Sequence, residues 1–216
     1  LGCYIVRFPN HIDTRGYFQR KYCESSFTSQ GLNSIWPQCN VSLNHKKATF
    51  RGFHYQETPY EEIKLVTCIK GRIQDAIFDV RINSSTFGKC FSVELSEEEN
   101  VSLYVAKGVA HGYLTLEDNS VVLYHVSSNY SKEKTRGLSV HDPNIKIKWS
   151  IKPKIISEID LTWPVGPESH ISCMGVELEK SRKGRWILGI SSLFVYFRNP
   201  SQATKIGKIA KTNKNV

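Results

Sequence analysis

The chain has 216 residues, of which 40% are hydrophobic and 23% are charged, which is ordinary for a globular protein and enough to bury a core. No uninterrupted run of about 18 apolar residues occurs, so no membrane span is predicted. The formal net charge is +9, but residues 1–164 carry only +3 of it and residues 165–216 carry +6, which argues against a nucleic-acid-binding core.

Residues 1–164 contain short β-like runs separated by turn-forming residues. Strands at this regular spacing favour an all-β sandwich or barrel. We therefore expect a jelly roll of the cupin type, which is a double-stranded β-helix. Helical periodicity is weak, and residues 97–100 are expected to form one helical turn. The clearest β-like runs are residues 65–69, 73–82, 91–95, 101–106 and 121–126.

The composition changes after Trp163-Pro164, where residues 165–167 are typical of a linker. The sequence therefore predicts a domain at residues 1–164 and a short, irregular, basic extension at residues 165–216. Within the extension, residues 186–197 are apolar and too short to cross a bilayer. They are interpreted as an extra strand, a surface-binding segment or a non-native extension. The Lys- and Asn-rich end is expected to be disordered.

Six cysteines are scattered along the chain without a CxxC pair or a metal-ligand spacing. We expect reduced thiols, as in a cytoplasmic protein. The first residues show no basic segment followed by an apolar one, so a secretory signal is not expected.

Eight short motifs of polar and aromatic residues follow one another along the first domain. The densest is Arg51-Gly52-Phe53-His54-Tyr55-Gln56, and it contains a histidine, a residue type that suits general base catalysis. The others are Asp13-Thr14-Arg15-Gly16-Tyr17-Phe18, Gln38-Cys39-Asn40, Lys64-Leu65-Val66, Ser84-Ser85-Thr86-Phe87-Gly88, Ala110-His111-Gly112-Tyr113, Leu123-Tyr124 and Ser157-Glu158-Ile159-Asp160.

The order and spacing of these motifs resemble the dTDP-4-dehydrorhamnose 3,5-epimerase family over about residues 3–163. The resemblance implies a cofactor-free cupin that epimerises dTDP-4-dehydro-6-deoxy-D-glucose at C3 and C5 to dTDP-4-dehydro-L-rhamnose. It also implies a homodimer in the cytoplasm that serves the synthesis of rhamnose-containing polysaccharides. The C4 ketone of the substrate makes the hydrogens at C3 and C5 acidic, so the reaction needs a base, an enolate stabiliser and an acid.

The resemblance assigns catalytic roles to four residues. His54 matches the base, and Asp160 matches the carboxylate that holds its ring. Lys64, together with Arg51, places positive charge where the enolate develops. Tyr124 matches the proton donor. The ordinary alternatives are a hydrogen-bonded core histidine, a solvated lysine at a strand edge and a tyrosine that packs in the core.

The resemblance also assigns substrate contacts. Arginine suits a diphosphate because its planar guanidinium binds two oxygens at once. An aromatic residue, Tyr130, matches the side chain that stacks on thymine. The ordinary alternatives are surface solvation for the arginines and packing at the rim for the tyrosine. The assigned residues are Arg15, Gln38, Asn40, Arg51, Lys64, His111 and Tyr130.

No metal or organic cofactor is predicted. Cupins often bind a metal through an H-x-H pair, but here the sequence reads His54-Tyr55-Gln56, and His111 alone does not make a site. No glycine-rich dinucleotide-binding loop is present.

Three residues depart from the family pattern. Arg20 and Thr135 stand where glutamates are expected, and Cys39 replaces an acidic residue. All three changes concern the nucleotide end of the site, so the exact nucleotide and sugar stay open. The alternatives are an epimerase that acts at C3 only or on another nucleotide 4-keto sugar, a non-catalytic nucleotide-sugar-binding cupin, and a nucleic-acid binder that uses the basic extension.

Overall fold

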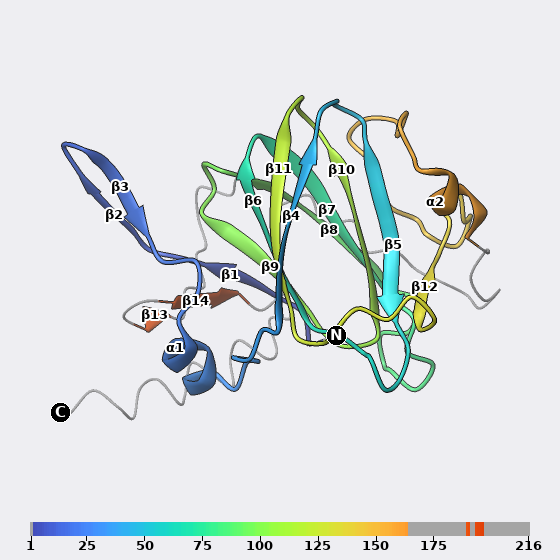
Figure 1. The fold of residues 1–216 in the computed structure, drawn as a ribbon, viewed down its shortest axis with the longest axis horizontal. Helices are drawn as coiled ribbons and strands as arrows, with labels where there is room; N and C mark the ends of the chain where they lie inside the picture. The colour runs from blue at the N-terminus through green and yellow to red at the C-terminus, as the bar shows by residue number, and fades with distance from the viewer. Residues whose placement is uncertain (1, 164–188, 191–192, 197–216) are drawn as a thin grey trace.

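The computed structural model of the protein describes residues 2–163, 189–190 and 193–196. Two antiparallel sheets pack face to face (Figure 1), and a separate hairpin extends from one side. In spatial order, the seven-stranded sheet contains β13 (Gly189–Ile190), β14 (Leu193–Tyr196), β1 (Tyr4–Arg7), β9 (Val101–Val105), β6 (Lys64–Lys70), β11 (Ser120–Val126) and β4 (Gln38–Asn44).

The second sheet has five strands and carries most of the long motif around His54. It contains, in spatial order, β12 (Thr135–Gly137), β5 (Phe50–Gln56), β10 (Val109–Thr115), β7 (Arg72–Asp79) and β8 (Cys90–Ser96). The remaining elements are the hairpin of β2 (Asn10–Asp13) and β3 (Gly16–Gln19) and the two short helices α1 (Glu24–Ser29) and α2 (Glu158–Thr162).

The main core lies between the two sheets, because both contribute alternate residues to one buried cluster. From the seven-stranded sheet, Val66 and Val122 enter this cluster, and from the five-stranded sheet, Ile77 and Leu95 do so. The neighbour Leu65 points the opposite way, into a cluster beneath α1. This alternation confirms the predicted all-β jelly roll.

The outer face of the five-stranded sheet is also covered. Phe50 and Phe53 of β5 pack there against the segment that leads to α2, which contributes Leu138, Ile145 and Trp149. This packing holds the chain close to β5 and lets α2 contact that strand. Sequence periodicity did not indicate this layer, because the segment has almost no regular structure.

One local expectation needs correction, and part of the extension can be compared with its prediction. Residues 97–100 form a turn and not a helical turn, with Asn100 at φ 55°. The described part of the extension forms β13 and β14, and β14 pairs with β1, so these residues match the extra-strand interpretation. The edge of β1 offers unpaired backbone groups to which a strand can bond. The linker, the basic stretch and the chain end lie outside the described residues.

The cysteines also differ from expectation. Cys3, Cys23, Cys39 and Cys68 are free thiols, but Cys90 is disulfide-bonded. The prediction of reduced thiols is wrong for Cys90, because disulfide pairing depends on proximity in the fold and not on spacing along the chain. Among the described residues, no helix is long and apolar enough to cross a membrane.

Candidate active site

The site begins with a pair formed by His54 and Asp160. The His54 Nε2 atom lies 2.6 Å from the Asp160 Oδ1 atom, although 106 positions separate the two residues in the sequence. His54 lies on β5, and Asp160 lies in α2, whose N-terminus is capped when the Asp160 N–H donates to Ser157 Oγ. Because a carboxylate only accepts hydrogen bonds, Nε2 carries the hydrogen and Nδ1 is the nitrogen that can take up a proton.

The Asp160 carboxylate is buried, with 5% of its side chain exposed, whereas His54 is 38% exposed. Burial raises the pKa of Asp160, but hydrogen bonds from His54, Ser157 and Gly52 lower it more, so the net pKa lies below its usual value. The indole N–H of Trp163 also donates to Asp160 Oδ1, at 3.2 Å. An ionised carboxylate is therefore fixed behind a histidine that solvent and substrate can reach.

Strand register places other predicted residues on the inner face of the seven-stranded sheet. Tyr124 of β11 packs against the core between the sheets, as does its neighbour Val122 on the same face. Tyr124 is paired with Asn40, and Val126 is paired with both Gln38 and Lys64. Directly paired residues share a face, so all of these side chains point toward the five-stranded sheet.

Two cations reach this region from different strands. Lys64 is 8% exposed, and its ammonium group donates to the backbone oxygen of His54 at 3.3 Å and pairs with Glu62 at 2.9 Å. The Arg51 Nε atom donates to Asn44 Oδ1 at 2.7 Å, which fixes the guanidinium beside β4. The two positive charges therefore lie on the inner side of the barrel.

Tyr124 lies within the electrostatic range of these groups. Burial raises the pKa of its phenol, Arg51 lowers it and Glu62 raises it, with a net increase above the usual value. The phenol therefore stays protonated through the neutral range and can donate a proton.

His111 is placed by a second buried pair. Its Nε2 atom lies 2.6 Å from Asp75 Oδ1, and Asp75 is fully buried. His111 is the register partner of His54 across β10 and β5, so the two imidazoles come from adjacent strands.

Two predicted binding residues lie away from this cluster. Arg15 lies at the turn of the β2–β3 hairpin, which projects from the sheets (Figure 1); its side chain is 88% exposed and pairs with Asp13 at 2.6 Å. Tyr130 is 64% exposed on the loop before β12. Within one chain, the structure therefore brings together His54, Asp160, Lys64, Arg51, Tyr124, Gln38, Asn40 and His111, but not Arg15 or Tyr130.

Sequence reasoning missed four polar residues that shape the site. Glu62 binds Lys64, and Asp75 binds His111. Asn44 binds Arg51, and the Tyr113 hydroxyl donates to Ser42 Oγ at 3.0 Å. Only Tyr113 belongs to a recognised motif. The others carry no local signal, because their partners are brought near by strand pairing.

The three departures from the family pattern lie outside the reacting cluster. Cys39 is exposed and paired with His125, on the opposite face of β4 and β11 from Tyr124. Thr135 donates through Oγ1 to the Ser131 carbonyl at 2.8 Å. Arg20 lines a small cavity of about 100 Å³ with Cys23.

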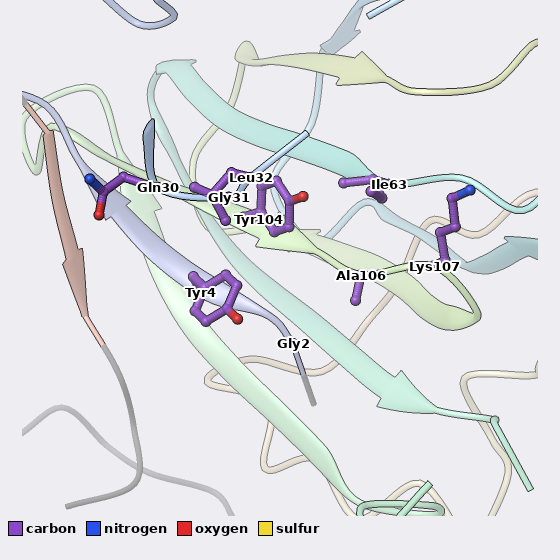
Figure 2. Close-up of a pocket in the computed structure, with 9 residues that line it drawn as sticks. All are labelled: Gly2, Tyr4, Gln30, Gly31, Leu32, Ile63, Tyr104, Ala106 and Lys107. Carbon is purple, nitrogen blue, oxygen red and sulfur yellow. The ribbon is translucent and has the colours of Figure 1, made fainter. Parts of the chain in front are cut away.

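A cavity of about 240 Å³ lies on another part of the molecule (Figure 2). Tyr4, Leu32, Tyr104 and Lys107 are among its lining residues. Tyr4, Leu32 and Tyr104 belong to the cluster beneath α1, on the outer face of the seven-stranded sheet. This cavity is therefore separate from the cluster around His54.

Within the described ranges, no group of three or more His, Cys, Asp or Glu side chains gathers as metal ligands would. The absence of a metal and of an organic cofactor stays a prediction from the sequence.

The family model of dTDP-4-dehydrorhamnose 3,5-epimerase matches residues 1–166. The chain belongs to the dTDP-4-dehydrorhamnose 3,5-epimerase family. The resemblance stated from the motifs is thereby confirmed, and the match covers the strands and helices that carry the epimerase motifs.

Individual relatives agree with this membership. The chain is 40% identical over 175 residues to the dTDP-4-dehydrorhamnose 3,5-epimerase of Sinorhizobium fredii, which covers 81% of this chain and 90% of that protein. The crystal structure of the Bacillus anthracis epimerase with TDP and PPi bound has a TM-score of 0.74 and 31% identity, and covers 76% of this chain and 94% of that one.

The chain is also similar to enzymes named as 3-epimerases. A dTDP-4-dehydro-6-deoxyglucose 3-epimerase from a Streptomyces species is 36% identical over 158 residues, which covers 71% of this chain and 79% of that protein. Overall similarity therefore does not by itself separate epimerisation at one carbon from epimerisation at two.

Proposed function

We propose that the protein epimerises C3 and C5 of dTDP-4-dehydro-6-deoxy-D-glucose and yields dTDP-4-dehydro-L-rhamnose for rhamnose synthesis. The observation that carries the proposal is the 2.6 Å contact between His54 and the buried Asp160, beside the cations Lys64 and Arg51. A base with a fixed carboxylate next to two positive charges suits proton removal adjacent to a ketone.

The proposed chemistry uses one proton transfer in each direction at each carbon. His54 Nδ1 removes the hydrogen next to the C4 ketone, and Asp160 stabilises the imidazolium that forms. The electron pair moves toward the ketone oxygen, and Lys64 and Arg51 stabilise the resulting enolate. The Tyr124 phenol then returns a proton to the carbon from the other face, which inverts the centre.

The remaining predicted residues are proposed to bind the nucleotide sugar. Gln38, Asn40 and His111 supply hydrogen-bonding groups on the inner faces of β4 and β10. Tyr130 is proposed to stack on the base, since its ring is exposed at the rim. No metal and no organic cofactor takes part in this proposal.

A homodimer is part of the proposal, because Arg15 lies on a hairpin that projects away from the site of its own chain. The hairpin that carries it also exposes Ile12, Tyr17 and Phe18, at 78%, 63% and 61%. Exposed apolar side chains on a projecting hairpin favour burial against another surface. We propose that the hairpin packs on a second copy and presents Arg15 to the site of that copy. Location in the cytoplasm stays a prediction.

The test is solvent exchange at the reacting carbons. The purified protein is incubated with dTDP-4-dehydro-6-deoxy-D-glucose in deuterated water, and the proton signals at C3 and C5 are followed by NMR. We expect both signals to disappear with the wild type and neither with His54→Ala. Loss at C3 alone would identify a 3-epimerase, the alternative that the similarity to the Streptomyces enzyme leaves open. Intact binding without exchange would identify a non-catalytic cupin.

A further inference from the structure

The loop between β5 and β6 places a largely covered carboxylate against the proposed catalytic Lys64. The Glu62 side chain is only 12% exposed. Its Oε1 atom lies 2.9 Å from Lys64 Nζ, and its Oε2 atom accepts a hydrogen bond from Gln56 Nε2 at 2.9 Å. The two oxygens of this carboxylate therefore bind different residues, Lys64 on β6 and Gln56 on β5.

Gln56 in turn binds the loop that carries Tyr130. Gln56 is 2% exposed, and its Nε2 atom donates to the Asn129 carbonyl at 3.1 Å. Its Oε1 atom accepts from the Ser131 N–H at 2.6 Å. The two contacts hold the backbone on both sides of Tyr130. A continuous set of hydrogen bonds thus runs from Lys64 through Glu62 and Gln56 to this loop.

We propose that Glu62 is a positioning residue that couples the enolate-stabilising Lys64 to the loop of the base-stacking Tyr130. The roles of Lys64 and Tyr130 in this inference rest on the proposed function. When the nucleotide orders the Tyr130 loop, Gln56 and Glu62 are held in place, and Lys64 is thereby fixed beside the backbone of His54. Binding at the nucleotide end then contributes to catalysis at the sugar end.

The chemistry of a carboxylate explains why a glutamate is required here. A carboxylate has two acceptor oxygens, whereas an amide has one acceptor and one donor. In Glu62→Gln, the single oxygen can accept from Lys64 or from Gln56, and the amide N–H₂ faces the other donor. One connection must therefore break, although the side chain keeps its size. Glu61→Gln makes the same chemical change at the neighbouring position, whose carboxylate is outside this set of contacts.

Glu62 also acts electrostatically on Tyr124, as does the charge of Arg51, and the phenol of Tyr113 interacts with Tyr124 in the same way. Its negative charge raises the pKa of Tyr124, so its removal lowers that pKa. The proton donor of Glu62→Gln should then ionise at lower pH. The alkaline limb of the pH–rate profile therefore moves to lower pH, which a loss of folding alone would not cause.

The experiment compares the wild type, Glu62→Gln, Glu62→Asp and Glu61→Gln. Amide hydrogen exchange of residues 127–134, with and without dTDP, reports on the loop without any need for activity. We expect faster exchange at Ser131 in Glu62→Gln and a fall in kcat/KM of about 10- to 100-fold, the factor for one lost charged hydrogen bond. Glu62→Asp keeps two acceptor oxygens, so it should recover part of the protection of Ser131 and part of kcat/KM. Glu61→Gln should match the wild type in both measurements.

Two outcomes with Glu62→Gln would overturn the inference. The first is protection of the Ser131 amide equal to that of the wild type. The second is a reduced kcat/KM while dTDP slows amide exchange in the loop as much as it does in the wild type. If the wild type itself does not exchange C3 or C5 hydrogens, the proposed function fails instead. The hydrogen-exchange comparison then still decides whether Glu62 controls the loop.

Discussion

At the scale of single residues, the proposed reaction is divided among side chains with opposite electrostatic requirements. Asp160 must be ionised, and its net pKa lies below the usual value. Tyr124 must be protonated, and its pKa lies above the usual value. One barrel interior meets both needs because hydrogen-bond donors surround the carboxylate, while burial acts on the phenol.

The role of Asp160 is tested with Asp160→Asn. The amide keeps the shape, but it cannot stabilise the imidazolium, and it can select the wrong tautomer of His54. We expect the rate of hydrogen exchange at C3 to fall by about 10²- to 10⁴-fold. Binding of dTDP, measured by calorimetry, should be unchanged. An exchange rate equal to that of the wild type would remove Asp160 from the mechanism.

The role of Tyr124 is tested with Tyr124→Phe, which removes only the hydroxyl. His54 can still remove the hydrogen, so we expect exchange into the substrate to persist while inverted product no longer forms. On the alkaline side, activity of the wild type should fall only above the neutral range, because the raised pKa keeps the Tyr124 phenol protonated below it. Product analysis by NMR across pH checks both points. Full product formation by the variant would show that another group donates the proton.

At the scale of elements, β5 and β10 must approach each other closely where the motif glycines meet. Gly52 has φ +130°, and a Cβ atom there would lie 2.4 Å from the Gly112 Cα atom and 2.8 Å from the His111 carbonyl oxygen. The register between the strands also shifts between His111 and Tyr113. The glycines therefore allow Arg51 and His54 to reach the barrel interior from the same strand.

This close approach predicts the effect of Gly52→Ala. Gly16 offers a matched control, because its φ is +129° and nothing lies within 4 Å of a Cβ atom placed there. Both alanine variants meet the backbone strain, but only Gly52→Ala adds a clash with β10. We expect Gly52→Ala to lower the free energy of unfolding by about 1 to 3 kcal/mol more than Gly16→Ala. Chemical denaturation measures the difference, and equal losses would contradict the clash.

At the scale of the whole molecule, two parts reach beyond the sandwich. The β2–β3 hairpin projects outward with Arg15, and β14 extends the seven-stranded sheet at β1. The hairpin is proposed to complete the site of another copy of the chain. Strand β14 belongs to the extension, which lies almost entirely beyond the residues matched by the family model.

The exchange of Arg15 between copies can be tested by mixing two inactive variants. In a dimer of one Arg15→Ala chain and one His54→Ala chain, one of the two sites receives both wild-type residues. Random mixing after joint refolding should therefore restore about a quarter of the wild-type activity. Each variant alone should stay inactive. No recovery, with dimers confirmed by sedimentation, would show that Arg15 does not act across the interface.

The extension is tested by removing residues 165–216. This deletion lowers the formal net charge from +9 to +3 and leaves the four proposed catalytic residues in place. We expect kcat/KM for the dTDP sugar to be retained and salt-dependent retention on a polyanion column to decrease. A large loss of kcat/KM in a folded, dimeric truncated protein would mean that the extension belongs to the catalytic unit.

The sequence by itself determined the all-β class and the identity of most proposed site residues. Alternating apolar residues specify strands because side chains alternate between faces, and the ordered motifs carried His54, Lys64 and Tyr124. Family membership was also predicted from the sequence, because the order and spacing of the motifs can be read along the chain without knowledge of the fold.

Only the tertiary structure decided most of the contacts among these residues. The pairing of Asp160 with His54 was already implied by the family resemblance, whereas the contacts of Asp75 with His111 and of Gln56 with the Tyr130 loop join distant positions that no motif links. Local periodicity contains no record of strand order or of the segment that covers β5, so it cannot predict such contacts. The same reason explains why the sequence did not place Arg15 on an exposed hairpin, from which it is proposed to reach the site of a second copy.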